Sequence, residues 1–394
     1  MWQFDDNVEV GNLVQPNIFG FWRHFLRFSP LNCSKGLLQI PFSLFSLAVF
    51  LSMCFRIYWM FWRTPTEFLT YGWGESNLYA FLTFESFTVL IGIFQMTRRD
   101  SLRRLEVNIG TLKTFRVKKN YEELDSYKKI YIKLFLFLIF IGVSIIGSAI
   151  YLLANKEIIV GTTHQSTWFY VFNFIVNIFC FYVQVLYLPV HVLIHSAIRR
   201  EIDIFNIELE EALKNPKSEA FQKLETRQVT LLNFTNFMTS RFSAILNYGG
   251  FTILVAVLNG SYITSSLYHD IDLLYYLCNL TLSISTIIIT CLLLYPHAII
   301  QESLLKTSRI LLSTSTLQQS PDVFQNCRLM MDRSLHNRQT CTVIHIFEIS
   351  RKNIERALFV LSITVIVMVV VYNFMKAEIE MGTGLAAASA AIKH

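Results

Sequence analysis

One stretch decides the fold: Ala357-Leu-Phe-Val-Leu-Ser-Ile-Thr-Val-Ile-Val-Met-Val-Val-Val-Tyr-Asn-Phe-Met375. It carries no charged side chain, and it is bounded by Arg356 and Lys376. A helix needs roughly 20 mostly apolar residues, at about 1.5 Å rise each, to cross about 30 Å of hydrocarbon with its backbone polar groups bonded internally. The stretch therefore predicts a membrane-spanning helix at 357–375.

Six further apolar stretches precede this one, and five of the six contain no Asp, Glu, Lys or Arg. The exception contains a single acid, Glu85. The sequence therefore predicts an all-α integral membrane protein with seven transmembrane helices. The six earlier spans are expected at 36–55, 76–97, 134–155, from about 168 within 158–198, 242–269 and 273–301.

The composition agrees with a membrane protein. The 394 residues are 53% hydrophobic and only 16% charged, and the mean hydropathy is +0.43. An average soluble domain is near a quarter charged, so an ordinary soluble protein is excluded. The net charge of +6 does not indicate a nucleic-acid partner, because the basic residues lie between the apolar stretches rather than on one face.

The basic residues also predict the orientation. Ten lie in 98–129, seven in 199–241 and eight in 306–356, whereas the alternate connections hold only Arg56, Arg63 and Lys156. Short cytoplasmic loops carry the excess of Lys and Arg. We therefore expect a plasma-membrane protein with its N-terminus inside and its C-terminus outside, the reverse of a G-protein-coupled receptor. The acidic start of the chain, Asp5-Asp6, does not resemble a cleaved signal peptide.

The connections on the basic side are long and carry apolar residues at helical spacing. Residues 199–238 predict two amphipathic helices with a break at Asn215-Pro216, and the sixth span is expected to continue past Pro296 through Leu312, followed by a second helix from about Val323. The expected organisation is a cytosolic N-terminal segment with an entry helix at 1–35, spans one to four at 36–198 with a basic loop at 98–129, a helical extension at 199–241, spans five and six at 242–301, anchor helices at 302–356, the last span at 357–376 and a short extracellular tail at 377–394.

No enzyme motif is present in the sequence. There is no phosphate-binding loop, no paired-glycine fingerprint and no His-Glu-x-x-His, so neither an enzyme activity nor a cofactor is expected. His191 and His195 are four residues apart on one helix face, a spacing that suits a metal, but no third ligand clearly converges on them. We expect no metal site. The seven cysteines fall in spans or on predicted cytosolic segments, so a disulfide framework is not expected.

These features together resemble the insect-type chemoreceptor superfamily, the gustatory and odorant receptor ion channels. The length, the seven spans, the inverted orientation and the long cytosolic helices are similar across nearly the whole chain. Asn17-Ile-Phe-Gly-Phe-Trp-Arg-His-Phe-Leu-Arg-Phe-Ser-Pro30 resembles the entry helix ahead of the first span, and His345-Ile-Phe-Glu-Ile-Ser-Arg-Lys-Asn353 resembles the Phe-x-Ile-x-Arg stretch of the gustatory branch.

The motif of the last helix departs from that family. The family pattern is Thr-Tyr, four residues, then Gln-Phe; Val371-Tyr372 and Ala377-Glu378 stand at those places, so only Tyr372 matches. The resemblance implies a homo- or heterotetramer with related receptor subunits, in which four copies of the last span line a pore for cations. Such an aliphatic pore would gate by dewetting. The pore residues expected on this basis are Val367, Val371, Tyr372, Met375 and Glu378.

Ligand candidates lie in the outer halves of the spans. A carboxylate within a span costs several kcal/mol unless it faces a partner or water, so Glu85 is either a pocket acid or a locally paired structural residue. Aromatic and amide side chains near the outer interface form either an aromatic belt or a small-molecule pocket. The ligand-binding residues expected among spans two to six are Glu85, Tyr151, Trp168, Tyr170, Asn173, Asn259, Tyr262, Tyr275 and Asn279.

The function expected from these observations is a chemosensory, ligand-gated, non-selective cation channel. Its partners would be a small-molecule ligand, a tastant or an odorant, together with the lipid bilayer and the permeating cations. Two alternatives remain open: a seven-helix receptor that signals through a cytosolic partner without conducting, and an odorant-receptor-type subunit that needs a co-receptor. A transporter is disfavoured because the sequence shows no inverted repeats.

Overall fold

The computed structural model describes residues 18–31, 39–63, 69, 71–98, 101–116, 127–154, 167–214, 216–266, 272–313, 321–336 and 342–392. Within these ranges seven helical segments are long and apolar enough to cross a membrane, which confirms the predicted all-α fold with seven spans. They are α2 (Gln39–Arg63), α3 (Tyr71–Arg98), α5 (Lys128–Ala154), α7 (Thr167–Lys214), the continuous segment of α8 (Ser218–Ala244), η1 (Ile245–Gly249) and α9 (Gly250–Ser266), α10 (Leu273–Ser313) and α12 (Arg351–Ile392).

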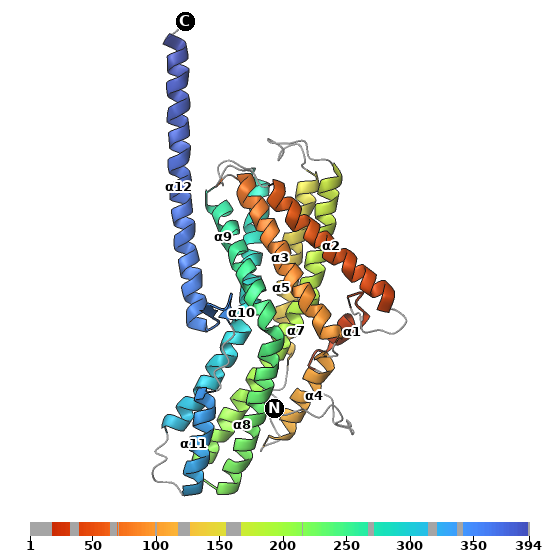
Figure 1. The fold of residues 1–394 in the computed structure, drawn as a ribbon, viewed down its shortest axis with the longest axis vertical. Coiled ribbons are helices and arrows are strands. Elements are labelled where there is room, and N and C mark those ends of the chain that lie inside the picture. The colour runs from red at the N-terminus through yellow and green to blue at the C-terminus, as the bar shows by residue number, and fades with distance from the viewer. Residues whose placement is uncertain are drawn as a thin grey trace.

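Three of these segments extend well beyond the membrane-spanning part (Figure 1). α7 ends at Lys214 and α8 begins at Ser218, which confirms the predicted break near Pro216. α10 runs through Pro296 to Ser313, and α11 (Pro321–His336) follows, as expected. With α4 (Ser101–Thr114), these parts form what we call the lower bundle: α4, α8, α11 and the lower ends of α7 and α10. The opposite end, where Asp272 lies, is the upper end.

The hydrophobic core of the spans continues into the lower bundle, as amphipathic helices outside lipid require. Leu209 of α7, Phe221 of α8 and Met330 of α11 are all fully buried. A buried group of charges lies in the same bundle. Arg227 of α8 binds Glu201 and Glu208 of α7, and Glu201 also accepts hydrogen bonds from Arg116, which follows α4. Each charge has an opposite partner, which is the condition for burying an ion in protein.

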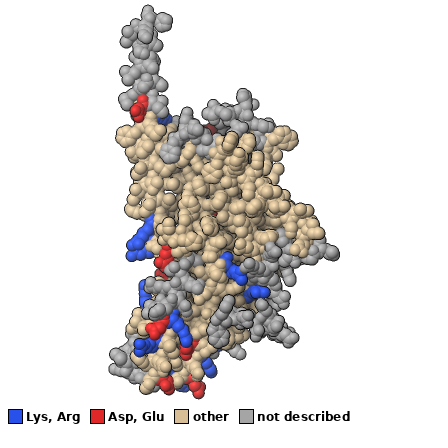
Figure 2. Space-filling view, viewed as in Figure 1, with Lys and Arg blue, Asp and Glu red and all other residues tan. Residues whose placement is uncertain are grey.

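Charge is divided sharply between the two parts of the molecule (Figure 2). On the face shown, Lys, Arg, Asp and Glu gather over the lower bundle, and a band almost free of them lies above. Large apolar side chains are exposed in that band on α2 and α5, for example Leu51 and Phe135. Soluble proteins rarely expose such contiguous apolar surface. The chain is a multi-pass membrane protein.

α12 differs from every other span because it stands at the edge of the bundle (Figure 1). Only 6% of its most apolar window is buried within the chain, against 22% to 67% for the other six spans. It contacts α9 and α10 along one side, where Val365 is buried. The helix also continues to Ile392, through most of the segment 377–394 that the sequence analysis treats as a tail. Its Ala-rich end explains this, since alanine is the best helix former.

The entry helix predicted within 17–30 is present as α1 (Phe21–Phe28). It is held beside the bundle from both ends. The hydroxyl of Tyr131 on α5 donates to the Ile18 carbonyl, and the hydroxyls of Ser29 and Tyr182 lie 2.9 Å apart. α1 is therefore tied to α5 and α7 at the level where the apolar band meets the lower bundle.

Candidate functional site

A polar cluster lies at the upper end between α3, α5 and α10. The rings of Tyr151 and Tyr275 stack with centroids 5.2 Å apart and planes 16° apart. The Tyr275 hydroxyl donates to a carboxylate oxygen of Glu75, and the Tyr151 hydroxyl donates to Asp272 at 3.1 Å. Three helices that are distant in sequence thus bring two predicted ligand residues, Tyr151 and Tyr275, into direct contact. The two acids that they bind were not among the predicted residues.

A second polar group lies beside it, between α2, α3 and α7. The guanidinium of Arg56 donates to the Asn177 amide oxygen at 2.6 Å and lies 5.3 Å from the centroid of the Tyr79 ring. Arg56 is 2% exposed. A buried cation in a membrane span is expensive and is usually tied to function, which makes this group part of the candidate site. Sequence reasoning assigned Arg56 to a connection because the first span ended too early, at 55, whereas α2 continues to Arg63.

Four more of the predicted ligand residues lie at the upper end, near the starts of α7 and α10. Tyr170 of α7 interacts electrostatically with Glu75. Asn173, one turn further along α7, is half-buried. Asn279 of α10 is buried and donates to the Tyr275 carbonyl at 3.1 Å, so its amide is held by its own helix. Trp168 is 80% exposed at the start of α7, which is the position of an interfacial aromatic.

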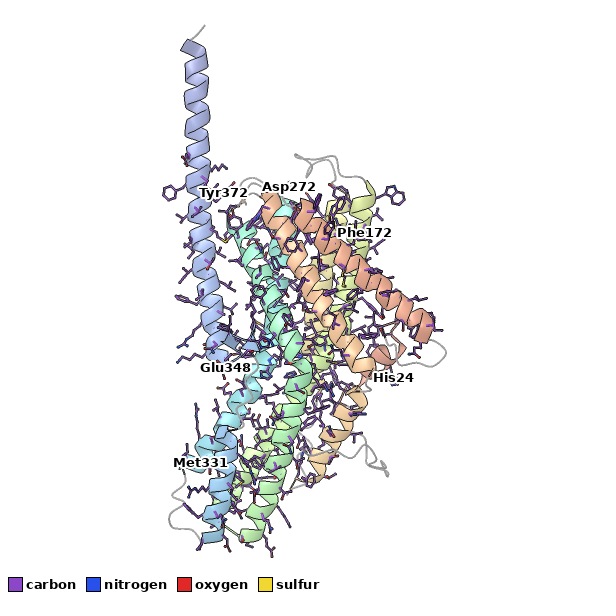
Figure 3. The ribbon with its side chains drawn as sticks, in the orientation of Figure 1. His24, Phe172, Asp272, Met331, Glu348 and Tyr372 are labelled. Carbon is purple, nitrogen blue, oxygen red and sulfur yellow. The ribbon has the colours of Figure 1, made fainter. Side chains whose placement is uncertain are left out.

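The two candidates on α9 lie on a different side of the bundle. The Tyr262 hydroxyl donates to the Leu69 carbonyl at 2.5 Å, and its ring makes edge contacts with Trp73 of α3 and Tyr372 of α12. Asn259 donates to the Val255 carbonyl of its own helix at 3.0 Å. Tyr262 is therefore a contact between the bundle and α12, and Figure 3 shows Tyr372 near the level of Asp272 at the upper end.

Glu85 lies deeper in α3 and is fully buried. The amide nitrogen of Gln184 on α7 donates to its Oε2, and the Ser86 hydroxyl lies 3.5 Å from the same oxygen. Its other oxygen, Oε1, and the Gln184 Oε1 have no hydrogen-bond partner among the described residues. Gln184 is the amide side chain on a neighbouring span that donates to Glu85, and sequence reasoning expected a partner of that kind, an amide or a hydroxyl group. The pair links α3 to α7 below the upper polar groups.

The predicted pore residues lie on the free part of α12. Val367 is 54% exposed, Val371 and Met375 are each 41% exposed, and Glu378 is exposed one turn beyond. Tyr372 is half-buried because it faces Tyr262. The aliphatic face at 367, 371 and 375 thus has no partner within the described part of the chain.

The base of α12 is held by a hairpin, β1 (Thr342–Val343) paired antiparallel with β2 (Phe347–Glu348). Its turn places Ile344 at φ 53° and His345 at φ 58°, a conformation that costs a β-branched residue roughly 1–2 kcal/mol. Asn247 of η1 accepts from the Thr342 hydroxyl at 3.2 Å and from the His345 N–H at 3.4 Å.

The η1 segment is a single turn of π-helix between α8 and α9. Such turns recur at functional sites, and this one connects the fifth span to the base of α12. Gly250 follows it, where a Cβ atom would lie 3.1 Å from Leu294 Cδ2 and 3.2 Å from Val343 Cγ2, so glycine lets α10 and the hairpin approach without a shift of these two side chains. Sequence reasoning missed Asn247; the Asn-Tyr-Gly-Gly stretch was the available signal.

A family model matches residues 18–365, described as "Caenorhabditis protein of unknown function, DUF267". That match covers most of the chain. The chain belongs to the DUF267 family. No curated protein sequence matches this DUF267 chain significantly.

Solved structures match its fold. The olfactory receptor OR5 of the insect Machilis hrabei superposes with a TM-score of 0.66 over 85% of this chain and 89% of the receptor, at 11% sequence identity. The same receptor in complex with eugenol gives a TM-score of 0.66 over 89% of this chain and 98% of that one, at 10% identity. This DUF267 chain therefore has the fold of an insect olfactory receptor, as the sequence resemblance implied.

Metal-binding chemistry finds no support in the described part of this DUF267 chain. No group of three or more His, Cys, Asp or Glu side chains converges there in a way that could hold an ion. His191 and His195 do lie together, with ring centroids 4.0 Å apart. His191 is occupied, however, since its ring nitrogens bond the Tyr187 hydroxyl and the Leu293 carbonyl.

Proposed function

We propose that this protein is a chemosensory receptor that acts as a ligand-gated, non-selective cation channel. One observation carries the proposal: six spans form a bundle of their own, and α12 keeps a long aliphatic face for which the described residues offer no partner. An aliphatic face is stable against lipid and by itself requires no protein partner. The additional observation is Glu378, which lies just beyond the apolar stretch of α12. Repetition of that helix around an axis would give a hydrophobic gate with a ring of carboxylates at one mouth.

The assembly would be a homo- or heterotetramer with related receptor subunits, in which four copies of α12 surround the pore. The fold likeness to an insect olfactory receptor supports this arrangement. The lower bundle, with its buried apolar residues and its buried charges, would form the anchor between subunits. The protein would lie in the plasma membrane with its N-terminus inside, because the basic residues gather over the lower bundle.

The ligand would be a small molecule, a tastant or odorant, bound among helices two to six at the upper end. The stacked pair Tyr151 and Tyr275 offers aromatic surface, and Glu75 and Asp272 offer acceptors beside it. Ligand pockets combine such apolar walls with a few polar groups. The likeness to a receptor solved with eugenol supports a ligand of this size.

The conformational effect of ligand binding would be transmitted to the pore through α9. This helix contacts α3 along its length, meets α12 at Tyr262 and Tyr372, and continues through η1 to the hairpin at the base of α12. A ligand that favours one arrangement of α3 and α9 would shift the population of α12 positions by its differential affinity for the two states.

The test is whole-cell current in cells that express this chain alone, with a G-protein blocker present, during application of sugars, bitter compounds and volatiles. A rapid, blocker-insensitive cation current is the expected result. A response that the blocker abolishes would overturn the channel and favour a seven-helix receptor that signals through a cytosolic partner. A current that appears only with a related subunit present would favour the odorant-receptor-type subunit that needs a co-receptor.

A further inference from the structure

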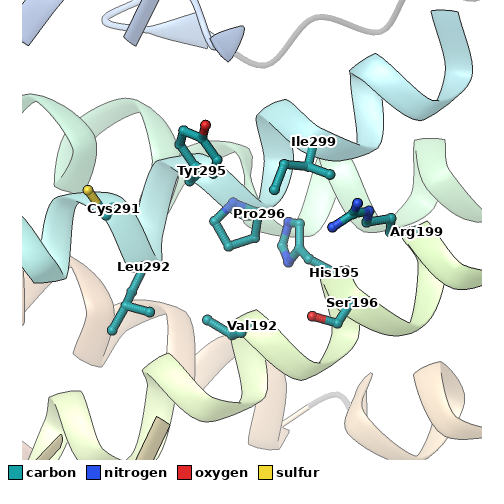
Figure 4. A pocket seen from close by; sticks show the side chains of 9 residues that line it. All are labelled: Val192, His195, Ser196, Arg199, Cys291, Leu292, Tyr295, Pro296 and Ile299. Carbon is teal, nitrogen blue, oxygen red and sulfur yellow. The ribbon is translucent and has the colours of Figure 1, made fainter. Parts of the chain in front are cut away.

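A groove of about 390 Å³ lies between α7 and α10, far from the upper polar groups (Figure 4). Ligand pockets typically measure about 300–1,000 Å³. α7 contributes Val192, His195, Ser196 and Arg199 to its walls, and α10 contributes Cys291, Leu292, Tyr295, Pro296 and Ile299.

The groove crosses the boundary between the apolar band and the lower bundle. Residues 167–198 of α7 and 273–301 of α10 carry no charge, and Arg199 is the first charged residue on its side. Both helices run in the same direction, from the upper end to the lower bundle. Val192, Cys291 and Leu292 therefore line the end nearer the membrane centre, and Arg199 lines the end at the interface. The groove is amphipathic along its length.

His195 places a hydrogen-bond acceptor without a described partner in the wall of the groove. It is 1% exposed, and its Nδ1 lies 2.7 Å from the His191 carbonyl oxygen. A carbonyl only accepts, so Nδ1 carries the proton, and Nε2 of the neutral ring carries a lone pair. No described side chain or backbone group bonds His195 Nε2. A buried acceptor without a partner costs about 1–3 kcal/mol, so it favours a ligand that brings a donor.

The backbone beside it points to the same requirement. Pro296 has no N–H to donate to the Leu292 carbonyl one turn earlier in α10, so a second acceptor lies on the groove wall without its usual helical donor. In Figure 4 the His195 ring lies between Pro296 and Arg199. The positive charge of Arg199 is half-exposed and bound to Asp203 at 3.4 Å, so it is already compensated.

From this geometry we propose that the groove binds an apolar alcohol, a membrane sterol or a long-chain alcohol. The hydroxyl group donates a hydrogen bond to His195 Nε2 at the interface. The hydrocarbon body lies along Val192, Cys291 and Leu292 toward the membrane centre. The ligand enters from the leaflet that adjoins the lower bundle. This site is separate from the ligand site at the upper end and rests on no part of the channel proposal.

The test is competition for photolabelling of the full chain in lipid nanodiscs by a diazirine analogue of cholesterol. The competitors are cholesterol, cholesterol methyl ether, 1-hexadecanol and its methyl ether. Each ether keeps the shape and the oxygen but loses the donor. The expected result is that an alcohol competes about ten-fold or more better than its ether, as loss of one buried hydrogen bond predicts. The better competitor of the two alcohols shows whether the groove prefers a sterol or a long-chain alcohol.

Two pairs of variants locate the site. His195→Phe keeps a ring without the acceptor and should weaken alcohol competition about ten-fold, while Ser240→Ala, at an exposed position of α8 that does not line the groove, should leave it unchanged. Cys291→Trp fills the membrane end of the groove and should abolish labelling there, with Cys291→Ala as its matched control. If His195→Phe does not fold, the Cys291 pair and the alcohol–ether comparison decide.

The proposal is overturned if an ether competes as well as its alcohol, if folded His195→Phe binds as the unchanged chain does, or if the label falls outside α7 and α10. It is also overturned if Cys291→Trp and Cys291→Ala label equally. None of these results depends on whether the protein conducts.

Discussion

Replacing Arg227 with methionine tests the lower bundle most sharply. The guanidinium binds Glu208 and Glu201, and the side chains of Arg227, Glu201 and Glu208 are 1%, 1% and 3% exposed. Arg116 binds Glu201 as well, so Arg227→Met takes from Glu208 an ion-pair partner that Arg116, on the Glu201 side of the group, does not replace. Breaking a buried pair in this way costs about 3–5 kcal/mol. The assay is the free energy of unfolding, from a reversible denaturant titration of the full chain in detergent.

Two further variants make the comparison quantitative. Arg333→Met removes a pair with Glu225 whose side chains are 35% and 21% exposed, and it should cost no more than about 1 kcal/mol. Adding Glu208→Gln to Arg227→Met neutralises the carboxylate that lost Arg227 and should recover about 1–3 kcal/mol. If Arg227→Met costs no more than Arg333→Met, or if the second substitution recovers nothing, the buried charges do not hold this bundle together.

Three other outcomes are expected. Tyr275→Phe removes the donor to Glu75 and should lower the free energy of unfolding by about 1–3 kcal/mol, whereas Tyr276→Phe should change it by under about 0.5 kcal/mol; equal effects would refute the cluster. Glu85→Gln should shift the midpoint of the ligand dose–response and leave assembly intact; an unaltered midpoint in surface-expressed protein removes Glu85 from the pocket. Burial raises the pKa of the Cys327 thiol to about 11, so its alkylation by iodoacetamide, followed by mass spectrometry, should rise about ten-fold for each pH unit from 8 to 10; fast labelling already at pH 8 would contradict its burial in α11.

The spans were predictable because a bilayer imposes a physical constraint that a single sequence displays. A charge-free stretch such as 357–375 has few alternatives to a membrane helix, and each predicted span coincides over most of its length with a helical segment of the structure. The break at Pro216 and the helix after Pro321 were predictable for a similar reason, since proline interrupts helical hydrogen bonding.

Contacts between helices were not predictable in the same way. Glu75 was not identified as the partner of Tyr275, nor Gln184 as that of Glu85, because periodicity does not say which helices are neighbours. Asn247 escaped notice because its role depends on a hairpin nearly 100 residues further along the chain. Residue type alone placed Trp168 among the ligand candidates, and it stands exposed at a helix end, the position of the aromatic-belt alternative.

The central claim is that the aliphatic face of α12 gates a pore, and a ligand-free leak current tests it most directly. Val371→Ser places a hydroxyl on the free face, and Val365→Ser makes the same change on the buried face against α9 and α10. A hydrophobic gate conducts when it is wetted. With both variants at equal surface density, we predict a standing cation current from Val371→Ser and none from Val365→Ser; Val371→Ser cells as silent as Val365→Ser cells would contradict the account.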